Sequence, residues 1–490
     1  MKINTSLANF KKKHIKKKNQ ILFYKFKCKN SKIIDNLINN FLYKKNSFIL
    51  ESVEKRRIRG RYTILGADPD KTWEFNNNKI HLIHNKKRKL INGKPYQFLK
   101  KLIENFNFSI PKNLPPLSSL LVGYFSYDII RYIEKLPNKC LDDLNIPDVR
   151  ILRPKTIIIY DNLLKNIYFL ANCFSDEKIT NYSEYYFKQL KNIRYLKNLA
   201  FANSKIFCVK KIKKNGKFIP HVSSNISKDK FKNIVMKAKQ YIKKGDIFQV
   251  VLSQRFETKL TKSPLEIYKK LRINNPSPFM FFFNFQDFQI IGSSPEILVR
   301  LRKNKLTIRP IAGTRPRGNN AKMDNFYKKQ LLNDKKELSE HLMLLDLGRN
   351  DVGKISKVDT VKVTEKFKIE KYSHVMHIVS NVEGKFDNKH PLLDTMLAGF
   401  PAGTVTGAPK IRAMEIIDEL EKSKRKMYAG AIGYFSANRN FDTCIALRTA
   451  LIKDNKFYIQ SGAGIVNDSI PEKEYLETVN KAKALLKALN

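Results

Sequence analysis

ELSEHLMLLDLGRND, at residues 337–351, and PEKEYLETVNKA, at residues 471–482, are the two stretches that decide the fold. Both combine apolar residues at helical spacing with a pair of glutamates. The first predicts a helix over residues 335–347 with apolar positions Leu338, Leu342 and Leu345. The second predicts a helix over residues 471–489, which begins at Pro471 and buries Leu476, Val479, Ala482, Leu485 and Leu486.

The glutamate pairs are Glu337 with Glu340 and Glu474 with Glu477. Residues three apart share a helix face, and like charges so close are unfavourable unless a cation or solvent offsets them. If the two helices meet, the four carboxylates could hold a Mg²⁺ ion that keeps several waters and binds substrate oxygens. The alternative is two solvated helix faces, which is favoured for either pair alone because Glu-x-x-Glu is common. The scarcity of acidic residues elsewhere shifts the balance mildly toward a site.

Around these helices, short apolar runs alternate with polar turns. TIIIY at 156–160 and LLVGYF at 120–125 predict strands, as does the run at 247–252. A further helix is expected from the N-cap Ser227 to Gly245. The class is therefore α+β, with antiparallel strands packed against helices. Polar residues 199–226 mark a boundary, so we expect a basic extension at 1–20, an N-terminal region at 21–210 and a second region at 226–488.

The formal charge of +50 arises from 94 Lys and Arg against 44 Asp and Glu. One explanation is a nucleic-acid-binding protein attracted to phosphates. However, lysine is spread along the whole chain and is not gathered into one stripe with aromatic residues. We therefore favour compositional drift and expect no nucleic-acid partner.

The five cysteines, Cys28, Cys140, Cys173, Cys208 and Cys444, form no Cys-x-x-Cys pair, so neither a zinc site nor a disulfide framework is predicted. A reducing, cytoplasmic environment fits this pattern. No apolar run approaches the roughly 20 residues that span a bilayer, so we expect no membrane association.

Several segments are suited to binding anions. Glycine-rich GFPAGTVTGAPK at 399–410, GAIG at 430–433 and Gly462-Ala463-Gly464 allow backbone N–H groups to approach a ligand closely. Arg448 is an isolated charge in the strand-like run CIALRTA, and its guanidinium suits a carboxylate. Tight turns and a structural arginine are the alternative. Neither GxGxxG nor a P-loop occurs, so no nucleotide cofactor is expected.

Two histidines, His374 and His377, lie three residues apart. In an extended segment they would face opposite ways, and no third ligand follows at short spacing. One acid–base histidine is therefore favoured over a metal site.

Taken together, these segments resemble the chorismate-utilising enzymes, a family that includes anthranilate, aminodeoxychorismate, isochorismate and salicylate synthases. The resemblance covers about residues 226–487 and adds to the two opening stretches GDIFQVVLS at 245–253, GSSPE at 292–296, PIAGTRPRG at 310–318, SHVMHIVSNVEG at 373–384, PAGTVTGAPK at 401–410 and QSGAGIV at 460–466. All occur in the family's order. The resemblance implies an anthranilate synthase component I-like fold of two intertwined regions, in which 226–488 is the chorismate-binding catalytic domain.

The resemblance also implies residue roles. Glu340 and Glu477 would bind Mg²⁺ directly, with Glu337 and Glu474 supporting through water, and the ion would hold the ring carboxylate of chorismate. The pocket of the enolpyruvyl carboxylate would be formed by Gly313, Thr314, Tyr428, Arg448, Gly462, Ala463 and Gly464. Glu296 would protonate the departing C4 hydroxyl, and His377, with Thr404 nearby, would assist the later loss of pyruvate.

Two positions separate the related activities. Isochorismate synthases carry a lysine base where this chain has Gln249. Aminodeoxychorismate synthases typically carry a nucleophilic lysine where this chain has Ala312, and alanine cannot attack the ring. What remains is addition of ammonia at C2, as in anthranilate synthase, the first committed step of L-tryptophan biosynthesis. A degenerate, inactive relative gains no support, because the catalytic positions are intact.

The N-terminal half resembles the family's tryptophan feedback site through ILES at 49–52, GRYTILG at 60–66 and NPSPFM at 275–280. L-Tryptophan would contact Ser52, Pro278, Phe279 and Met280 as an inhibitor. No cysteine has the glycine-flanked setting of a glutamine amidotransferase nucleophile. The resemblance therefore implies a separate glutaminase subunit that supplies ammonia, in a heterotetramer of two copies of each chain.

Overall fold

The computed structural model describes residues 3–30, 32–52, 60–202, 221–372 and 375–489. Its α-helices are α1 (Leu7–Ile15), α2 (Lys32–Phe41), α3 (Pro95–Asn105), α4 (Tyr182–Phe201), α5 (Lys228–Lys243), α6 (Pro264–Asn274), α7 (Ala321–Asn333), α8 (Lys335–Gly353), α9 (Leu392–Leu397), α10 (Lys410–Leu420) and α11 (Pro471–Leu486). Short 3₁₀ turns lie at η1 (Tyr127–Tyr132) and η2 (Gly403–Val405).

The strands of the first half are β1 (Gln20–Lys27), β2 (Ser47–Glu51), β3 (Tyr62–Asn76), β4 (Lys79–His84), β5 (Lys87–Ile91), β6 (Leu120–Phe125), β7 (Val149–Asp161), β8 (Asn166–Cys173) and β9 (Ser223–Ser224). Those of the second half are β10 (Gln249–Lys259), β11 (Phe279–Asn284), β12 (Gln289–Ser294), β13 (Ile297–Arg302), β14 (Lys305–Ile308), β15 (Ile311–Pro316), β16 (Lys362–Lys371), β17 (Val375–Lys385), β18 (Gly407–Ala408), β19 (Ala431–Ser436), β20 (Phe441–Ile445), β21 (Thr449–Lys453) and β22 (Lys456–Ile465).

Antiparallel pairing joins the two halves of the chain. β6 pairs with β19, where Gly123 lies opposite Gly433, and β2 pairs with β11, where Glu51 lies opposite Met280. A side chain at Gly123 would meet the carbonyl oxygen of Arg150 on β7, so this crossing requires glycine. The α+β class and the two intertwined regions are confirmed. The division at 21–210 and 226–488 stays a prediction, because these strand pairs cross it and residues 203–220 lie outside the described chain.

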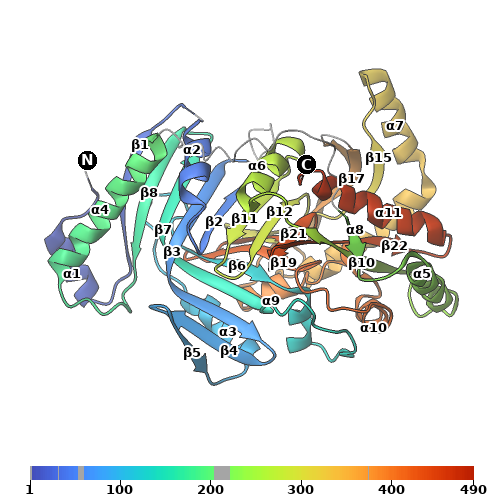
Figure 1. The fold of residues 1–490 in the computed structure, drawn as a ribbon, viewed down its shortest axis with the longest axis horizontal. Coiled ribbons are helices and arrows are strands. Elements are labelled where there is room, and N and C mark those ends of the chain that lie inside the picture. The colour runs from blue at the N-terminus through green and yellow to red at the C-terminus, as the bar shows by residue number, and fades with distance from the viewer. Residues whose placement is uncertain (1–2, 31, 53–59, 203–220, 373–374, 490) are drawn as a thin grey trace.

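The helices cover the sheet at its two ends (Figure 1). α1, α2 and α4 lie beside β1 and β8, whereas α5, α10 and α11 gather around β10 and β22 at the other end. α8 packs on β15 and β17. The two helices that carry the glutamate pairs belong to the same end of the molecule, because Gln249 of β10 also contacts Glu340 of α8.

Local capping explains where the key helices begin and end. The Ser227 hydroxyl accepts from the backbone N–H of Lys230, and Gly245 ends α5 with a left-handed φ of +80°. The Asp334 carboxylate caps α8 at the N–H groups of Lys336 and Glu337. α8 then runs through Gly348 and continues to Gly353, six residues beyond the predicted end.

The predicted burial of Leu476 is wrong, and Leu342, one of the apolar positions predicted for α8, is exposed as well. Leu342 on α8 is 43% exposed and Leu476 on α11 is 45% exposed. α8 instead turns His341, Leu344 and Leu345 inward, and α11 buries Thr478, Ala482 and Leu485. Ala482 and Leu485 are thus buried as predicted and Leu476 is not, because helical spacing alone does not show which strands a helix covers.

The four described cysteines, Cys28, Cys140, Cys173 and Cys444, are buried free thiols, and Cys208 lies outside the described residues. Among the helices of the described chain, none combines the length and the apolar character needed to cross a bilayer.

Candidate active site

The carboxylates of α8 and α11 meet around Glu340. Burial raises the pKa of Glu340, and the neighbouring charges of Glu337 on the same helix and Glu477 on α11 raise it further. Gln249 at the start of β10 donates from Nε2 to Glu340 Oε1 over 2.9 Å. The two helices therefore approach each other near Glu340, and Gln249 lies beside that carboxylate.

Cations already partner the outer carboxylates. Arg315 Nη1 lies 3.0 Å from Glu337 Oε1, and Lys481 Nζ lies 2.7 Å from Glu477 Oε1. Burial raises the pKa of Glu474, and the nearby Glu477 adds to this shift. No group of three or more His, Cys, Asp or Glu side chains is arranged to hold a metal ion in the part of the chain that the structure describes.

The donor set nevertheless fits a hard divalent cation. Burial and neighbouring carboxylates raise the pKa values of Glu340 and Glu474, and oxygen ligands of this kind are those that Mg²⁺ takes. A cation among them would relieve the repulsion that the present arrangement leaves around Glu340.

The glycine segment 462–464 forms the floor beside these carboxylates. It lies on β22 opposite β10, with Gly464 facing Val251 and Gly462 facing Ser253. A Cβ added at Gly462 would lie 2.6 Å from the Tyr428 hydroxyl oxygen, and one at Gly464 would lie 2.6 Å from Gln249 Nε2. The glycines are needed because these side chains approach the backbone closely. Buried Tyr428 has its pKa raised to about 12, so its hydroxyl stays a hydrogen-bond donor.

Arg448 lies outside the strand in which the sequence placed it. β20 ends at Ile445 and β21 begins at Thr449, and Arg448 between them has a left-handed φ of +48°. A non-glycine residue in this region is uncommon and costs free energy, which points to a functional demand on its direction. Burial lowers the pKa of Arg448, and the charge of Glu296 nearby opposes that shift. The guanidinium therefore lies within electrostatic reach of Glu296.

Glu296 is a buried acid between β12 and β13, with a side chain 5% exposed. Burial raises its pKa to about 8, although a hydrogen bond from Thr404, one from the backbone of Ile311 and the charge of Arg448 oppose the rise. Thr404 Oγ1 donates to Glu296 Oε1 over 3.1 Å. A carboxyl that keeps its proton at neutral pH beside an arginine is suited to protonating a leaving group.

His377 lies on β17 and is buried. Its Nδ1 is 3.0 Å from the carbonyl oxygen of Gly313 and 3.0 Å from Thr314 Oγ1. A carbonyl only accepts, so Nδ1 carries the proton and Nε2 is left as the acceptor in the neutral ring. Burial lowers the pKa of His377 to about 4, and Arg448 adds to this. His374 lies outside the described residues.

Gly313 has a left-handed φ of +72°, and a Cβ there would lie 3.1 Å from Glu337 Oε2. The turn that holds His377 therefore also faces the carboxylates of α8. The structure thus brings together the predicted carboxylates, glycines, Arg448, Glu296, Thr404 and His377.

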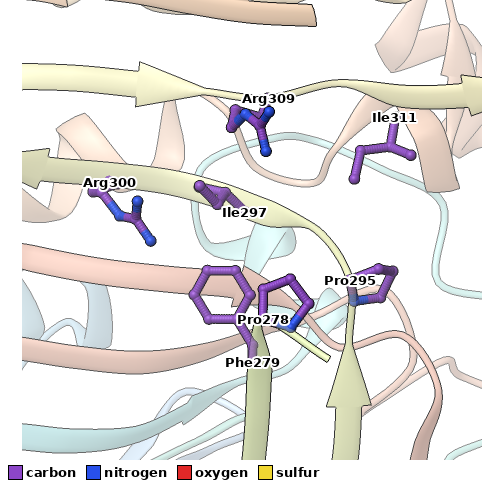
Figure 2. A pocket seen from close by; sticks show the side chains of 7 residues that line it. All are labelled: Pro278, Phe279, Pro295, Ile297, Arg300, Arg309 and Ile311. Atoms are coloured by element: carbon purple, nitrogen blue, oxygen red, sulfur yellow. The ribbon is translucent and has the colours of Figure 1, made fainter. Parts of the chain in front are cut away.

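The predicted tryptophan-contacting residues gather at β2 and β11. Met280 pairs with Glu51, the neighbour of Ser52, and Phe279 pairs with Ser294, two residues before Glu296. The Ser52 hydroxyl is buried and has no hydrogen-bond partner among the described residues. Pro278 and Phe279 also line a pocket that extends toward the Glu296 turn (Figure 2), with walls completed by Pro295, Ile297, Arg300, Arg309 and Ile311.

Sequence reasoning missed three cationic residues at the site. Lys481 Nζ donates to the carbonyl oxygen of Gly462 over 2.9 Å, Arg315 pairs with Glu337, and Arg425 lies beneath the floor. Lys481 follows Glu477 by one helical turn, which is the only local pattern that could have indicated it. Arg425 also has a local partner in Glu421, but its contacts to Val405 and Val251 and the contact of Arg315 to Glu337 join residues far apart in the sequence.

Comparisons with known proteins show which family the chain resembles. A family model described as chorismate binding enzyme matches residues 45–487. Anthranilate synthase component 1 of Cereibacter sphaeroides is 44% identical over 489 residues, covering 99% of this chain and 97% of that protein. The protein of the same name from Acetivibrio thermocellus is 44% identical and covers 90% of each chain.

Solved structures show the same relationship. Anthranilate synthase component I from Streptococcus pneumoniae superposes with a TM-score of 0.77 at 36% identity, covering 88% of this chain and 94% of that one. The menaquinone-specific isochorismate synthase of Escherichia coli shares the fold, with a TM-score of 0.70 at 17% identity over 99% of both chains. With a family model across most of its length and relatives of this similarity, the chain belongs to the chorismate binding enzyme family.

Proposed function

We propose that this chain is the chorismate-converting subunit of an anthranilate synthase, a carbon–oxygen lyase of tryptophan biosynthesis. The observation that carries this proposal is Glu296, a buried acid with its pKa raised to about 8 that accepts from Thr404, in a site where the charge of Arg448 acts on both Glu296 and the neutral His377. Relatives of that name, 44% identical over nearly the whole chain, support it.

The first step is addition of ammonia at C2 of chorismate with loss of the C4 hydroxyl. Glu296 gives its proton to that hydroxyl, which leaves as water, and the product is aminodeoxyisochorismate. The raised pKa keeps Glu296 protonated at neutral pH, when an ordinary glutamate would be ionised. The hydrogen bond from Thr404 then stabilises the carboxylate that forms.

The second step eliminates pyruvate and makes the ring aromatic. A proton leaves C2 and the enolpyruvyl C–O bond breaks. His377 is placed to assist, because its Nδ1 proton is held by Gly313 and its Nε2 is free to accept. The two carboxylates of bound chorismate would raise the pKa of His377 from about 4, which makes it a better base with substrate present.

Arg448, Tyr428 and the amides of residues 462–464 would bind the enolpyruvyl carboxylate, with Gly313 and Thr314 on the same wall. Glu340 and Glu477 would hold Mg²⁺, with Glu337 and Glu474 supporting through water. The ion, when bound, supplies positive charge that binds the ring carboxylate. Binding both carboxylates of chorismate would fix C2 and C4 relative to Glu296 and His377, and this positioning would contribute to the rate.

Ammonia would come from a partner glutaminase subunit, in a heterotetramer of two copies of each chain. Component 1 in the names of the relatives implies such a second component. L-Tryptophan would inhibit by binding at Ser52, Pro278, Phe279 and Met280. The buried Ser52 hydroxyl without a described partner supports a polar ligand there.

Isochorismate synthase is the second candidate, since its fold is shared. Gln249 argues against it, because its amide donates to Glu340 and cannot act as the base that activates water. Ala312 likewise offers no nucleophile for aminodeoxychorismate synthesis.

Product analysis tests the proposal. The purified chain is incubated with chorismate, Mg²⁺ and ammonium at pH 7.5–8.5, and the products are separated by liquid chromatography with mass detection. Anthranilate and pyruvate in equal amounts are expected. Isochorismate, or aminodeoxychorismate as the end product, would show that the assignment to anthranilate synthase is wrong. Replacing ammonium by glutamine plus a glutaminase component should restore anthranilate formation.

A further inference from the structure

Beneath the floor of the site lies a guanidinium to which neither the sequence nor the proposed reaction gives a role. Arg425 is 2% exposed and follows α10. Its Nε and Nη2 donate to the two oxygens of Glu421 over 2.9 and 2.6 Å. Nη1 donates to the carbonyl oxygen of Val405 over 2.7 Å, and Nη2 to that of Val251 over 2.6 Å. One planar group thus ties together three separate segments.

Two of these segments, those of Val405 and Val251, carry parts of the site. Val405 directly follows Thr404, the donor to Glu296. Val251 lies on β10 opposite Gly464 and two residues after Gln249. The backbone N–H of Val251 in turn donates to the carbonyl oxygen of Thr406, so the loop of η2 and strand β10 are joined twice around Arg425.

Aromatic contacts extend the same link to the anion pocket. The Arg425 guanidinium carbon lies 5.4 Å from the ring centre of Tyr428 and 5.0 Å from that of Tyr127. Tyr428 presents its hydroxyl to Gly462. A guanidinium over a buried ring is attracted to its face, which fixes the height and tilt of the ring.

We propose that Arg425 is a positioning residue. It holds Thr404, and through it the acid Glu296, at a fixed position relative to the pocket formed by Tyr428, Gly462 and Gly464. The inference rests on the proposed function. A buried ion pair that served stability alone would need only Glu421, which already accepts from Ser253 N and Oγ as well. Arg425 instead makes two further hydrogen bonds to carbonyl oxygens, one to Val405 in the loop of η2 that carries Thr404 and one to Val251 on β10.

Arg425→Lys is the direct test, because lysine keeps the charge but lacks the planar fork that reaches Glu421, Val251 and Val405 together. We expect kcat to fall by about 100-fold, the scale of a small misplacement of reacting groups. The basic limb of the kcat–pH profile should move to higher pH, because a displaced Thr404 no longer stabilises the Glu296 carboxylate. Arg448, the other charged group facing Glu296, is unchanged in this variant.

Arg131→Lys is the matched control. Arg131 is a mostly buried arginine that pairs with Asp128 and Asp418. Among the described residues it makes no hydrogen bond to the loop of η2 that carries Thr404, to β10 or to Tyr428. It should lose stability and keep the wild-type kcat and pH profile. Glu421→Gln, which leaves the guanidinium in place, provides a second variant if Arg425→Lys does not fold, and it should shift the limb in the same direction.

The double variant Thr404→Val/Arg425→Lys separates positioning from general damage. If Arg425 acts through Thr404, the basic limb of the kcat–pH profile should lie at the same pH in the double variant as in Thr404→Val alone. An unchanged pH limb and kcat in folded Arg425→Lys, or an equal further shift in the Thr404→Val background, would overturn the proposal. Calorimetric chorismate binding, expected to weaken in Arg425→Lys, does not depend on which product the wild type makes. Failure of the proposed function would therefore show in the wild-type product and not in this comparison.

Discussion

The opposite pKa shifts of Glu296 and His377 are the strongest evidence at the scale of single residues. Burial raises the pKa of the carboxyl to about 8 and lowers that of the imidazole to about 4, so both are uncharged at neutral pH. One then holds a proton to give and the other has a nitrogen free to accept one. Residue type and motif predicted these two groups, but burial, which sets their charge, depends on strands far away in the sequence.

The acid role predicts a pH dependence. kcat should be high below pH 8 and fall as pH rises through about 8, because Glu296 then loses the proton that it must donate. Glu296→Gln should lower kcat by about 10²- to 10⁴-fold, the usual contribution of general acid catalysis, and abolish that limb. Steady-state rates between pH 6 and 10 check this. A wild-type limb that persists in the residual activity of Glu296→Gln would assign it to another group.

Glu296 also leads to a prediction about stability, in which Glu296→Gln is favourable although the same substitution lowers kcat. The folded pKa of about 8 lies above the ordinary 4.5, so the folded state binds this proton more tightly than the unfolded state does. The contribution of Glu296 to stability is full below pH 4.5 and is lost as pH rises to about 8. Glu296→Gln, which cannot ionise, should therefore raise Tm relative to wild type at pH 9 and change it little at pH 5. Thermal melts at both pH values test this, and an equal Tm difference at each would contradict it.

Elements rather than single residues place the carboxylates. The glutamate spacing on α8 and α11 was readable from the sequence, as were the Ser227 cap and the Gly245 end of α5. The Gln249–Glu340 contact was not, because it joins residues 91 apart through the meeting of β10 and α8. Arg448 was misplaced in a strand because a left-handed residue between two strands leaves no trace in an apolar run.

Gly462 and Gly464 on β22 leave no room for a side chain, because Tyr428 and Gln249 lie directly against them. Gly464→Ala would place a Cβ 2.6 Å from Gln249 Nε2, and this mobile amide would move away from Glu340. We expect a higher KM for chorismate and a higher Mg²⁺ requirement with little loss of Tm. Gly353→Ala at the end of α8 is the matched control, since its Cβ would enter open space. Equal kinetic effects in the two variants would remove the argument for close approach at Gly464.

Across the whole molecule, antiparallel pairing connects the predicted feedback site to the acid. β2 pairs with β11, β11 pairs with β12, and Phe279 faces Ser294 just before Glu296. Strand partners so distant in sequence could not be predicted from local pattern, although the feedback motif itself could. The sheet gives a short physical link by which a ligand at β2 and β11 would bias the acid's position.

If tryptophan binds at β2 and β11, a substitution there should change inhibition by tryptophan without changing turnover in its absence. Ser52→Ala removes a buried hydroxyl from the predicted tryptophan contact and should raise the tryptophan concentration for half-inhibition by about 10-fold, the scale of one lost hydrogen bond. kcat and KM without tryptophan should stay at wild-type values. Inhibition curves at fixed chorismate measure this. Unchanged inhibition would place the tryptophan site elsewhere.

The measurement that tests the central claim most directly is anthranilate fluorescence from the purified chain with chorismate, ammonium and Mg²⁺, repeated with EDTA and with Glu340→Gln. The account predicts emission from the wild type, its loss on chelation, its return when Mg²⁺ is restored in excess, and little or none from the variant. Chorismate consumed without anthranilate, or wild-type emission that survives both EDTA and Glu340→Gln, would contradict it.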